Sequence, residues 1–424
     1  MPVHLIQTGV IHLGSVVLSV GVGVVLARFL GPGEFGLYAF ALAIVTLSVV
    51  LVEFGLPTVM LREAAARRED PAMIRAIASR LAVVVLVNGA VAVGLLIGSW
   101  LIARVAMRDA VPLAPYGPVL GIGLALLPVL ALVKLGSGTL RGTGAMLTGQ
   151  TTEFVVRNLL LSLAALATFA IWPDARTAPS AMAIHVCAAL ATLAITGAAL
   201  ARVLPRPPKA ARPDPVKAPA IRPRLRSGFF FLLGSSALIV NTQLDVVMVG
   251  SLLGAEDVGL YRVAAQAAIL TSFGLQIVQV ALAPRFSRAW REGDLAAMKR
   301  LWLQGAAFGG GLALIALAAF ASSGRVLLAT VFGDAYSGSF TVLLILCVGY
   351  AANAACGPVG VMLSMANRER LVAACIWATL LGNVALNFTL IPLFGLQGAA
   401  IATAVAVAGL QGAMAIVAYR TLNG

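Results

Sequence analysis

The sequence predicts an all-α integral membrane protein, and two observations support this prediction. Of the 424 residues, 60% are hydrophobic and only 11% are charged, whereas a soluble domain has about 45–50% apolar and about 25% charged residues. The apolar residues also form long runs, and a helix needs about 20 of them in succession to cross a bilayer. A soluble fold would have to expose much of this apolar surface to water. The sequence therefore predicts that lipid, rather than water, surrounds most of the protein.

We count twelve apolar runs of this kind, which predicts about 12 transmembrane helices. The runs cover residues 10–30, 38–61, 81–102, 113–133, 148–172, 178–201, 229–252, 259–284, 301–322, 340–363, 371–393 and 398–419. Prolines inside 113–133 and 340–363 predict kinks in these two helices.

The distribution of basic residues predicts how the chain is oriented. The net charge is +14, from 30 Lys and Arg against 16 Asp and Glu. Alternate gaps between the runs hold 23 basic residues on one side and five on the other. Because basic loops stay in the cytoplasm, both termini are expected there, in a multi-pass protein of the cytoplasmic (inner) membrane. The charge needs no nucleic-acid partner to explain it.

Motifs for catalysis and for metal binding are absent from the sequence. The four cysteines lie inside apolar runs, and the three histidines are scattered, so no metal site is expected. A membrane glycosyltransferase is the main enzymatic alternative, but the chain has neither a D-x-D motif nor a large soluble loop. No lysine lies in a Walker A sequence, so ATP is not expected to drive the protein directly. We therefore predict a non-enzyme without a cofactor.

An internal repeat divides the chain into two halves. Gly-Pro-Gly-Glu-Phe-Gly-Leu-Tyr at 31–38 matches Gly-Ala-Glu-Asp-Val-Gly-Leu-Tyr at 254–261, at an offset of 223 residues. We predict an N-terminal six-helix bundle at 1–201 and a C-terminal one at 228–424. Six spans are an even number, so the two halves form a parallel repeat, in which substrate binds between them.

The segment 202–227 between the halves is predicted to be a cytoplasmic linker. It contains eight basic residues and seven prolines but a single acid, Asp214. This composition favours an extended connection, and the alternative is a clamp for anionic lipid headgroups at the membrane surface.

Several motifs in both halves resemble one membrane-protein family. They are Ala27-Arg-Phe-Leu-Gly-Pro-Gly-Glu-Phe-Gly-Leu-Tyr38, Phe54-Gly-Leu-Pro57, Asp245-Val-Val-Met-Val-Gly250, Asn387-Phe-Thr-Leu-Ile-Pro392 and Gly395-Leu-Gln-Gly-Ala-Ala400. This pattern resembles the polysaccharide-biosynthesis flippases, which are related to the multidrug and toxic-compound extruders. The resemblance implies a V-shaped transporter fold of two six-helix bundles that works by alternating access.

The resemblance also implies a cargo and partners. The cargo would be a polyprenyl-pyrophosphate-linked oligosaccharide, flipped to the outer leaflet for a surface polysaccharide such as O-antigen or an exopolysaccharide. Membrane lipids are implied partners, with a polysaccharide polymerase and glycosyltransferases as candidate protein partners. Flippases for peptidoglycan precursors typically carry two further helices, for which this chain has no room. The alternative is a multidrug or cation extruder of the same superfamily.

Polar residues inside the fifth span are candidates for binding the cargo. Glu153 and Arg157 are four residues apart and share one helical face with Gln150. Arginine suits a phosphate because its planar fork donates two hydrogen bonds. The alternative is a structural Glu153–Arg157 pair that allows the helix to insert.

The seventh span offers a candidate for ion coupling. Asp245 lies one helical turn after Asn241, and the resemblance places a common aspartate there. A secluded carboxylate could bind Na⁺ or a proton. The alternative is a structural contact with a neighbouring helix.

Further polar residues predict a hydrated cavity between the halves. Glu53 matches Gln276 through the repeat offset, and Gln276 extends a stripe of the eighth span that includes Arg262 and Gln266. Arg262 could instead reach the outer membrane interface. Two arginines within spans favour an anionic cargo over the cationic drugs that an extruder would carry.

Overall fold

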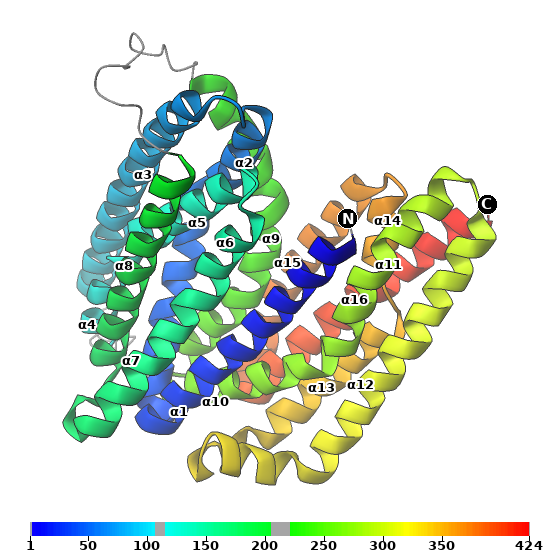
Figure 1. Cartoon of the computed structure of the whole chain (residues 1–424). Helices are drawn as coiled ribbons and strands as arrows, with labels where there is room; N and C mark the ends of the chain where they lie inside the picture. The colour runs from blue at the N-terminus through cyan, green and yellow to red at the C-terminus, as the bar shows by residue number, and fades with distance from the viewer. Residues whose placement is uncertain (1, 107–114, 205–220, 424) are drawn as a thin grey trace. The chain divides into compact units, whose positions relative to one another are not determined.

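The computed structural model describes residues 2–106, 115–204 and 221–423, and every regular element in these ranges is a helix. Figure 1 shows the helices coloured in chain order. Contacts between residues group the chain into two compact units. Unit 1 contains Met1–Leu30 and Phe40–Ile239, and unit 2 contains Gly31–Ala39 and Val240–Gly424.

Among the described residues, the first part of the chain contains ten helical elements, of which η1 is a π-helix and η2 a 3₁₀-helix. They are α1 (Pro2–Glu53), α2 (Leu56–Ala66), α3 (Pro71–Ala106), α4 (Tyr116–Gly123), α5 (Leu126–Gly142), α6 (Met146–Gln150), η1 (Thr151–Val156), α7 (Arg157–Ile171), η2 (Pro173–Ala175) and α8 (Ala178–Val203).

The second part has the same helical character, with 3₁₀ turns at η4 and η5. Its elements are α9 (Ile221–Leu252), α10 (Ala255–Ala268), η4 (Ile269–Ser272), α11 (Phe273–Arg291), α12 (Leu295–Val331), η5 (Asp334–Ser339), α13 (Phe340–Ala355), α14 (Val359–Met365), α15 (Glu369–Phe394) and α16 (Leu396–Asn423).

The prediction of an all-helical membrane protein is confirmed. Within the described residues, ten helical stretches are long and apolar enough to cross a membrane, and Ile239–Leu252 is a shorter apolar helix. The count of twelve stays a prediction, because two of the predicted spans lie in the single helix α1. This helix is sharply bent at Gly31, whose φ of 73° is outside the helical range, and Pro32 follows.

Two other spans are interrupted near their prolines. The fourth span divides between α4 and α5, around Leu124. The tenth span divides between α13 and α14, where Gly357 has a φ of 75° and Pro358 follows. Trp302 donates its indole hydrogen to the carbonyl oxygen of Cys356 at 2.8 Å, which satisfies a backbone group at the break. The predicted kinks are thus found in both spans.

Helix α5 is at the centre of unit 1, where it packs against α2, α3 and α8. Small residues allow the close approach that membrane helices favour. A Cβ atom added at Gly138 would lie 2.4 Å from the carbonyl oxygen of Pro57 on α2, and one at Gly136 would lie 2.6 Å from Thr196 on α8. This tight packing holds the polar side chains of α5 in fixed positions.

Unit 2 packs α15 against α16, and α13 against both α12 and α16. Gly349 of α13 lies against Ala404 of α16, where an added Cβ would come within 2.5 Å of the backbone. An apolar core at one end joins α11, α12, α14 and α16 around Phe286 and Met298. These contacts place α16 beside α13 and α15.

The predicted division into halves stays a prediction. The described helices reach Val203 before the linker and resume at Ile221 after it, so both ends of the predicted 202–227 segment are helical. Residues 205–220 of this segment lie outside the described residues.

Candidate functional site

The carboxylate of Asp245 in unit 2 is buried and accepts four hydrogen bonds. Its Oδ1 accepts from Nδ2 of Asn387 at 2.8 Å and from Nδ2 of Asn383 at 3.1 Å. Its Oδ2 accepts from Oγ1 of Thr403 at 2.8 Å and from the hydroxyl of Tyr261 at 3.3 Å. All four donors are neutral, so their dipoles stabilise the charge of Asp245 without cancelling it.

Four helices bring this Asp245 cluster together. Asp245 lies on α9, Asn383 and Asn387 one turn apart on α15, Thr403 on α16 and Tyr261 on α10. Each of these five side chains is at least nine-tenths buried. Because each donor sits on a tightly packed helix, the carboxylate has a fixed position inside the unit.

The predicted pair Asp245 and Asn241 does lie together, through a third residue. Asn383 uses its second amide hydrogen to donate to Oδ1 of Asn241, at 3.3 Å. Asn387 likewise donates its second amide hydrogen to Oδ1 of Asn383, at 2.6 Å. Among the described residues, the buried Oδ1 of Asn387 has no hydrogen-bond partner.

The donor set of this cluster would suit a small hard cation. It offers a carboxylate, amide oxygens and hydroxyls, which are the ligand types that hard cations prefer. Rotation of the Asn387 amide would turn its unsatisfied oxygen toward Asp245. No group of three or more His, Cys, Asp or Glu side chains that could hold a metal occurs in the described part of the chain.

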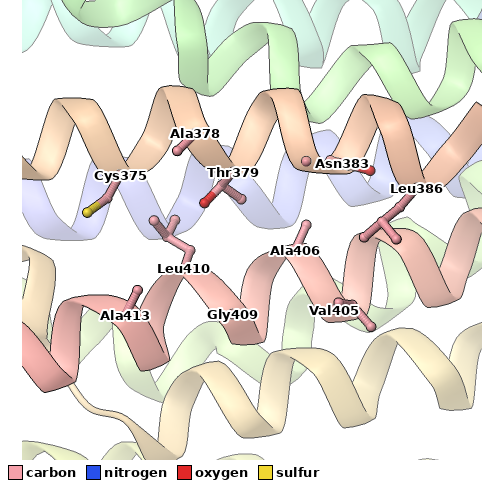
Figure 2. A pocket seen from close by; sticks show the side chains of 11 residues that line it. Cys375, Ala378, Thr379, Asn383, Leu386, Val405, Ala406, Gly409, Leu410 and Ala413 are labelled. Carbon is pink, nitrogen blue, oxygen red and sulfur yellow. The ribbon is translucent and has the colours of Figure 1, made fainter.

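A groove of about 290 Å³ runs between α15 and α16 and reaches this cluster. Its walls are mostly apolar and small, with Ala378, Ala406 and Gly409 among them, and Thr379 and Asn383 add polar groups. In Figure 2, Thr379 of α15 is directed toward α16, and Ala406 of α16 is directed toward α15. Asn383 therefore lies between the groove and the carboxylate of Asp245.

Unit 1 contains a second polar cluster, in which each acid meets a cation. Nζ of Lys134 lies 2.9 Å from the carboxylate of Glu53, and Nη2 of Arg141 lies 3.5 Å from that of Glu153. Ser137 shares its hydroxyl hydrogen between Glu153, at 2.6 Å, and the carbonyl oxygen of Gly149, at 2.8 Å. Lys134, Ser137 and Arg141 form one stripe on α5, and we call these five side chains the α5 cluster.

The cations of the α5 cluster are more exposed than its acids. The exposed side-chain fraction is 29% for Lys134 against 11% for Glu53, and 24% for Arg141 against 13% for Glu153. The acids are thus more deeply buried than the cations, and each cation keeps part of its side chain exposed. A charged group in a membrane span faces water or a partner rather than lipid, so this face of α5 is suited to line a hydrated cavity.

The structure corrects the sequence analysis on Lys134 and Arg141. Both were assigned to a loop between spans, but α5 continues to Gly142 and includes them. The apolar run ends before Lys134, whereas the helix continues to Gly142, and Lys134 is paired there with the carboxylate of Glu53.

Glu153 lies in the π-helix η1, and the partners found for it are on α5 rather than on its own helix. Arg157, its predicted partner, is the first residue of α7, and Gln150 is the last residue of α6. The wider turn of a π-helix changes the angular offset between positions four residues apart. The cargo-binding role assigned to Arg157, Glu153 and Gln150 stays a prediction.

The predicted stripe of the eighth span is interrupted by a change of helix type. Arg262 and Gln266 lie one turn apart on α10, whereas Gln276 follows the 3₁₀ turn η4 and lies on α11. Nε2 of Gln276 donates to the hydroxyl of Ser272 at 3.2 Å. Whether these residues and Glu53 line a common cavity stays a prediction.

Comparison with known proteins identifies the family. The family model for polysaccharide biosynthesis proteins matches residues 5–290. The chain belongs to the polysaccharide biosynthesis protein family. The resemblance noted in the sequence is thereby confirmed. Comparison with curated protein sequences found no match.

Solved structures share the fold of this polysaccharide biosynthesis protein at low sequence identity. A multidrug resistance MATE family transporter of the MOP superfamily, in an inward-facing conformation, is 14% identical with a TM-score of 0.75, covering 96% of this chain and 94% of its own. The lipid II flippase MurJ, in an inward closed conformation, is 12% identical with a TM-score of 0.72. The match covers 98% of this chain and 87% of the MurJ chain.

A transporter of the MOP superfamily from Pyrococcus furiosus, described as having a binding pocket of reverse polarity, also matches. It is 13% identical with a TM-score of 0.62, covering 99% of this chain and 95% of its own. These similarities confirm the predicted transporter fold.

Four members of the Asp245 cluster were not predicted from the sequence. Asn383, Asn387, Thr403 and Tyr261 are neutral. Neutral residues such as Asn241 and Gln150 were selected because a charged residue lies one turn away on the same span, and these four have no such neighbour. One usable signal was present: Asn383 and Asn387 are one turn apart within a predicted span, where buried polar groups require partners.

Proposed function

We propose that this protein moves a polyprenyl-pyrophosphate-linked oligosaccharide from the cytoplasmic to the outer leaflet of the cytoplasmic membrane. Membership in the polysaccharide biosynthesis family and the transporter fold support this proposal. The α5 cluster is the structural observation that carries it, because its two cations lie in front of their acids.

A pyrophosphate suits the α5 cluster in charge and in spacing. Lys134 and Arg141 are seven residues apart on one helix, or about 10 Å along its axis. The charge distribution predicts that Arg141 lies nearer the cytoplasmic end of α5, so an incoming headgroup would meet it first. Arginine would donate a two-pronged hydrogen bond, and Lys134 would offer a point charge deeper in the span.

Two driving forces are available to this transport. Each negative charge that leaves an inside-negative cell gains about 2.3 kcal/mol per 100 mV of membrane potential. We further propose that Asp245 couples transport to Na⁺ or H⁺, because its charge has only neutral partners and a rotated Asn387 would complete an oxygen site. Such coupling would make transport respond to the ion as well as to the potential.

The experiment that tests the cargo is a flipping assay in reconstituted vesicles with a fluorescent polyprenyl-pyrophosphate disaccharide. Replacing the pair Glu53→Gln with Lys134→Gln removes one cation without leaving a lone acid. We expect transport and the binding of inorganic pyrophosphate to fall about tenfold, the loss expected for one charge-assisted contact of about 1.4 kcal/mol.

The matched control is another ion pair of unit 1, between Glu63 and Arg224, which lie 2.7 Å apart. The double replacement Glu63→Gln with Arg224→Gln should leave pyrophosphate binding unchanged. If vesicles moved cationic dyes but not the disaccharide, the extruder interpretation would replace the proposed one.

A further inference from the structure

The two copies of the repeated motif contact each other within unit 2. A Cβ atom added at Gly36 would lie 1.7 Å from the carbonyl oxygen of Ala255, and one at Gly259 would lie 2.1 Å from that of Pro32. The repeat offset of 223 residues makes Gly36 equivalent to Gly259, and Pro32 equivalent to Ala255. The contact is therefore reciprocal, since the glycine of each copy lies on the equivalent backbone of the other.

The backbone of each copy is shaped for this approach. Gly31 and Gly254 are equivalent, and both have a positive φ, of 73° and 139°. Each glycine turns the chain so that a helical turn begins directly after it, at Pro32 or Ala255. The two turns then meet at positions four residues apart with small side chains, a spacing that lets membrane helices approach closely.

The larger side chains of the two motifs are buried. Phe35 and Tyr38 in the first copy are each 3% exposed, and their equivalents Val258 and Tyr261 are 0% and 2% exposed. The atoms nearest to Gly36 and Gly259 belong to the backbone of the other copy. A contact without interlocked side chains can separate without changes of rotamer.

The charge distribution predicts that this contact lies on the outer side of the membrane. The two motifs begin in the gaps 31–37 and 253–258, which contain no basic residue and alternate with the basic cytoplasmic gaps. A transporter that works by alternating access must close one end while the other is open.

We propose that the reciprocal contact of Gly36 and Gly259 is a releasable closure, which seals the outer end and opens in each transport cycle. The glycines are needed because any side chain at either position would overlap the opposing backbone. The closure is then a property of the repeat itself, and it does not depend on which cargo the protein carries.

The structure links this closure to the Asp245 cluster by one residue. Tyr261 lies two positions after Gly259, and its hydroxyl contacts both Asp245 and Thr403. This link rests on the proposed ion coupling: a cation or proton at Asp245 would compete for the contact with Tyr261. Occupancy of the cluster would thereby bias the second copy of the motif toward release.

The first test measures the distance between the two copies. Spin labels go on Gly33→Cys and Glu256→Cys, which are equivalent and exposed, after the four native cysteines are replaced. Gly36→Ala and Gly259→Ala should each shift the population toward the longer distance. Gly98→Ala is the control, because nothing lies within 4 Å of a Cβ added there. Unchanged distances in both motif variants would overturn the closure.

The second test does not depend on the folding of a glycine variant. A cleavable cross-link between Gly33→Cys and Glu256→Cys should stop transport in vesicles, and cleavage should restore it. Undiminished transport by the cross-linked protein would contradict the proposal. The distance measurement uses no cargo. If the glycine variants lengthen the distance but the wild type flips no disaccharide, the proposed cargo is wrong and the closure still stands.

The ion link has its own readout in the same labelled protein. Addition of Na⁺, or a change of pH, should alter the distance distribution of the wild type. Tyr261→Phe should abolish this response while the short distance persists. A response of Tyr261→Phe equal to that of the wild type would remove Tyr261 from the mechanism.

Discussion

Unit 1 and unit 2 both hold acidic side chains inside membrane-spanning helices, but the charges of their partners differ. In the α5 cluster, Glu53 is paired with Lys134 and Glu153 with Arg141. In the Asp245 cluster, two amides and two hydroxyls surround a single acid. The first cluster is therefore neutral as a whole, and the second keeps a net negative charge whenever Asp245 is ionised.

This difference separates two roles. A neutral set of ion pairs inserts into a membrane at lower cost and keeps its geometry without a ligand. A lone buried carboxylate gains most from a cation or a proton, since either would cancel its charge. We infer that unit 1 presents a fixed polar surface to the cargo, whereas unit 2 holds the group that responds to ions.

The largest effect is expected for Asp245→Asn. An amide keeps the size of the side chain but removes the only charge of the cluster, so cation or proton binding should be lost. We expect transport to fall about a hundredfold, which corresponds to about 2.7 kcal/mol, and its response to Na⁺ or pH to disappear. Flipping measured across a range of ion concentrations checks both expectations.

Asp174→Asn provides the control for this prediction. Asp174 is exposed, lies in the short 3₁₀-helix η2 and belongs to neither cluster, so its replacement should leave the ion response intact. If Asp245→Asn kept the wild-type response, the contrast between the two units would lose its functional meaning.

A smaller effect, on stability, is expected for Lys134→Met. This change leaves Glu53 buried without its cation, and breaking a buried pair costs about 3–5 kcal/mol. Because Lys134 is 29% exposed, we expect the free energy of unfolding to fall by about 2 kcal/mol, below that range. The double change Lys134→Met with Glu53→Gln should restore most of this loss, as measured by denaturation in detergent.

Equal instability of the single and double variants would show that Lys134 acts through packing. The ion pair would then not account for the charge on α5, and the neutral character of unit 1 would need another explanation.

The features that the sequence predicts well are those set by the bilayer. Apolar run length marks the membrane helices because about 20 residues are needed to cross, and α3, α8 and α15 each contain a predicted run. Asp245 is also recognisable, because a charge within such a run is rare.

Features that depend on partners from other helices could not be predicted in this way. Lys134 and Arg141 were assigned to a loop because hydropathy ends a span at a charge and cannot detect a compensating acid on another helix. Glu153 was matched with Arg157 by a spacing of four, which assumes a regular α-helix, whereas Glu153 lies in a π-helix and also contacts Arg141 and Ser137 on α5. The pairing with Arg157 stays a prediction. Tertiary packing, which a single sequence does not reveal, decides these cases.

The smallest effect is expected for the second pair of the α5 cluster. Arg141 lies 3.5 Å from Glu153, compared with 2.9 Å for Lys134 and Glu53, and Glu153 would keep its hydrogen bond from Ser137. Arg141→Met should therefore lower the free energy of unfolding by only about 1 kcal/mol. A double-mutant cycle with Glu153→Gln isolates the coupling energy of the pair from the loss of the arginine's apolar contacts. The same cycle for Lys134 and Glu53 should give the larger coupling, because its charges are closer and its acid has no comparable hydroxyl donor among the described residues. A larger coupling for Arg141 and Glu153 would reverse this ranking and would make the C-terminal end of α5, rather than its middle, the more firmly held part of the proposed cargo surface.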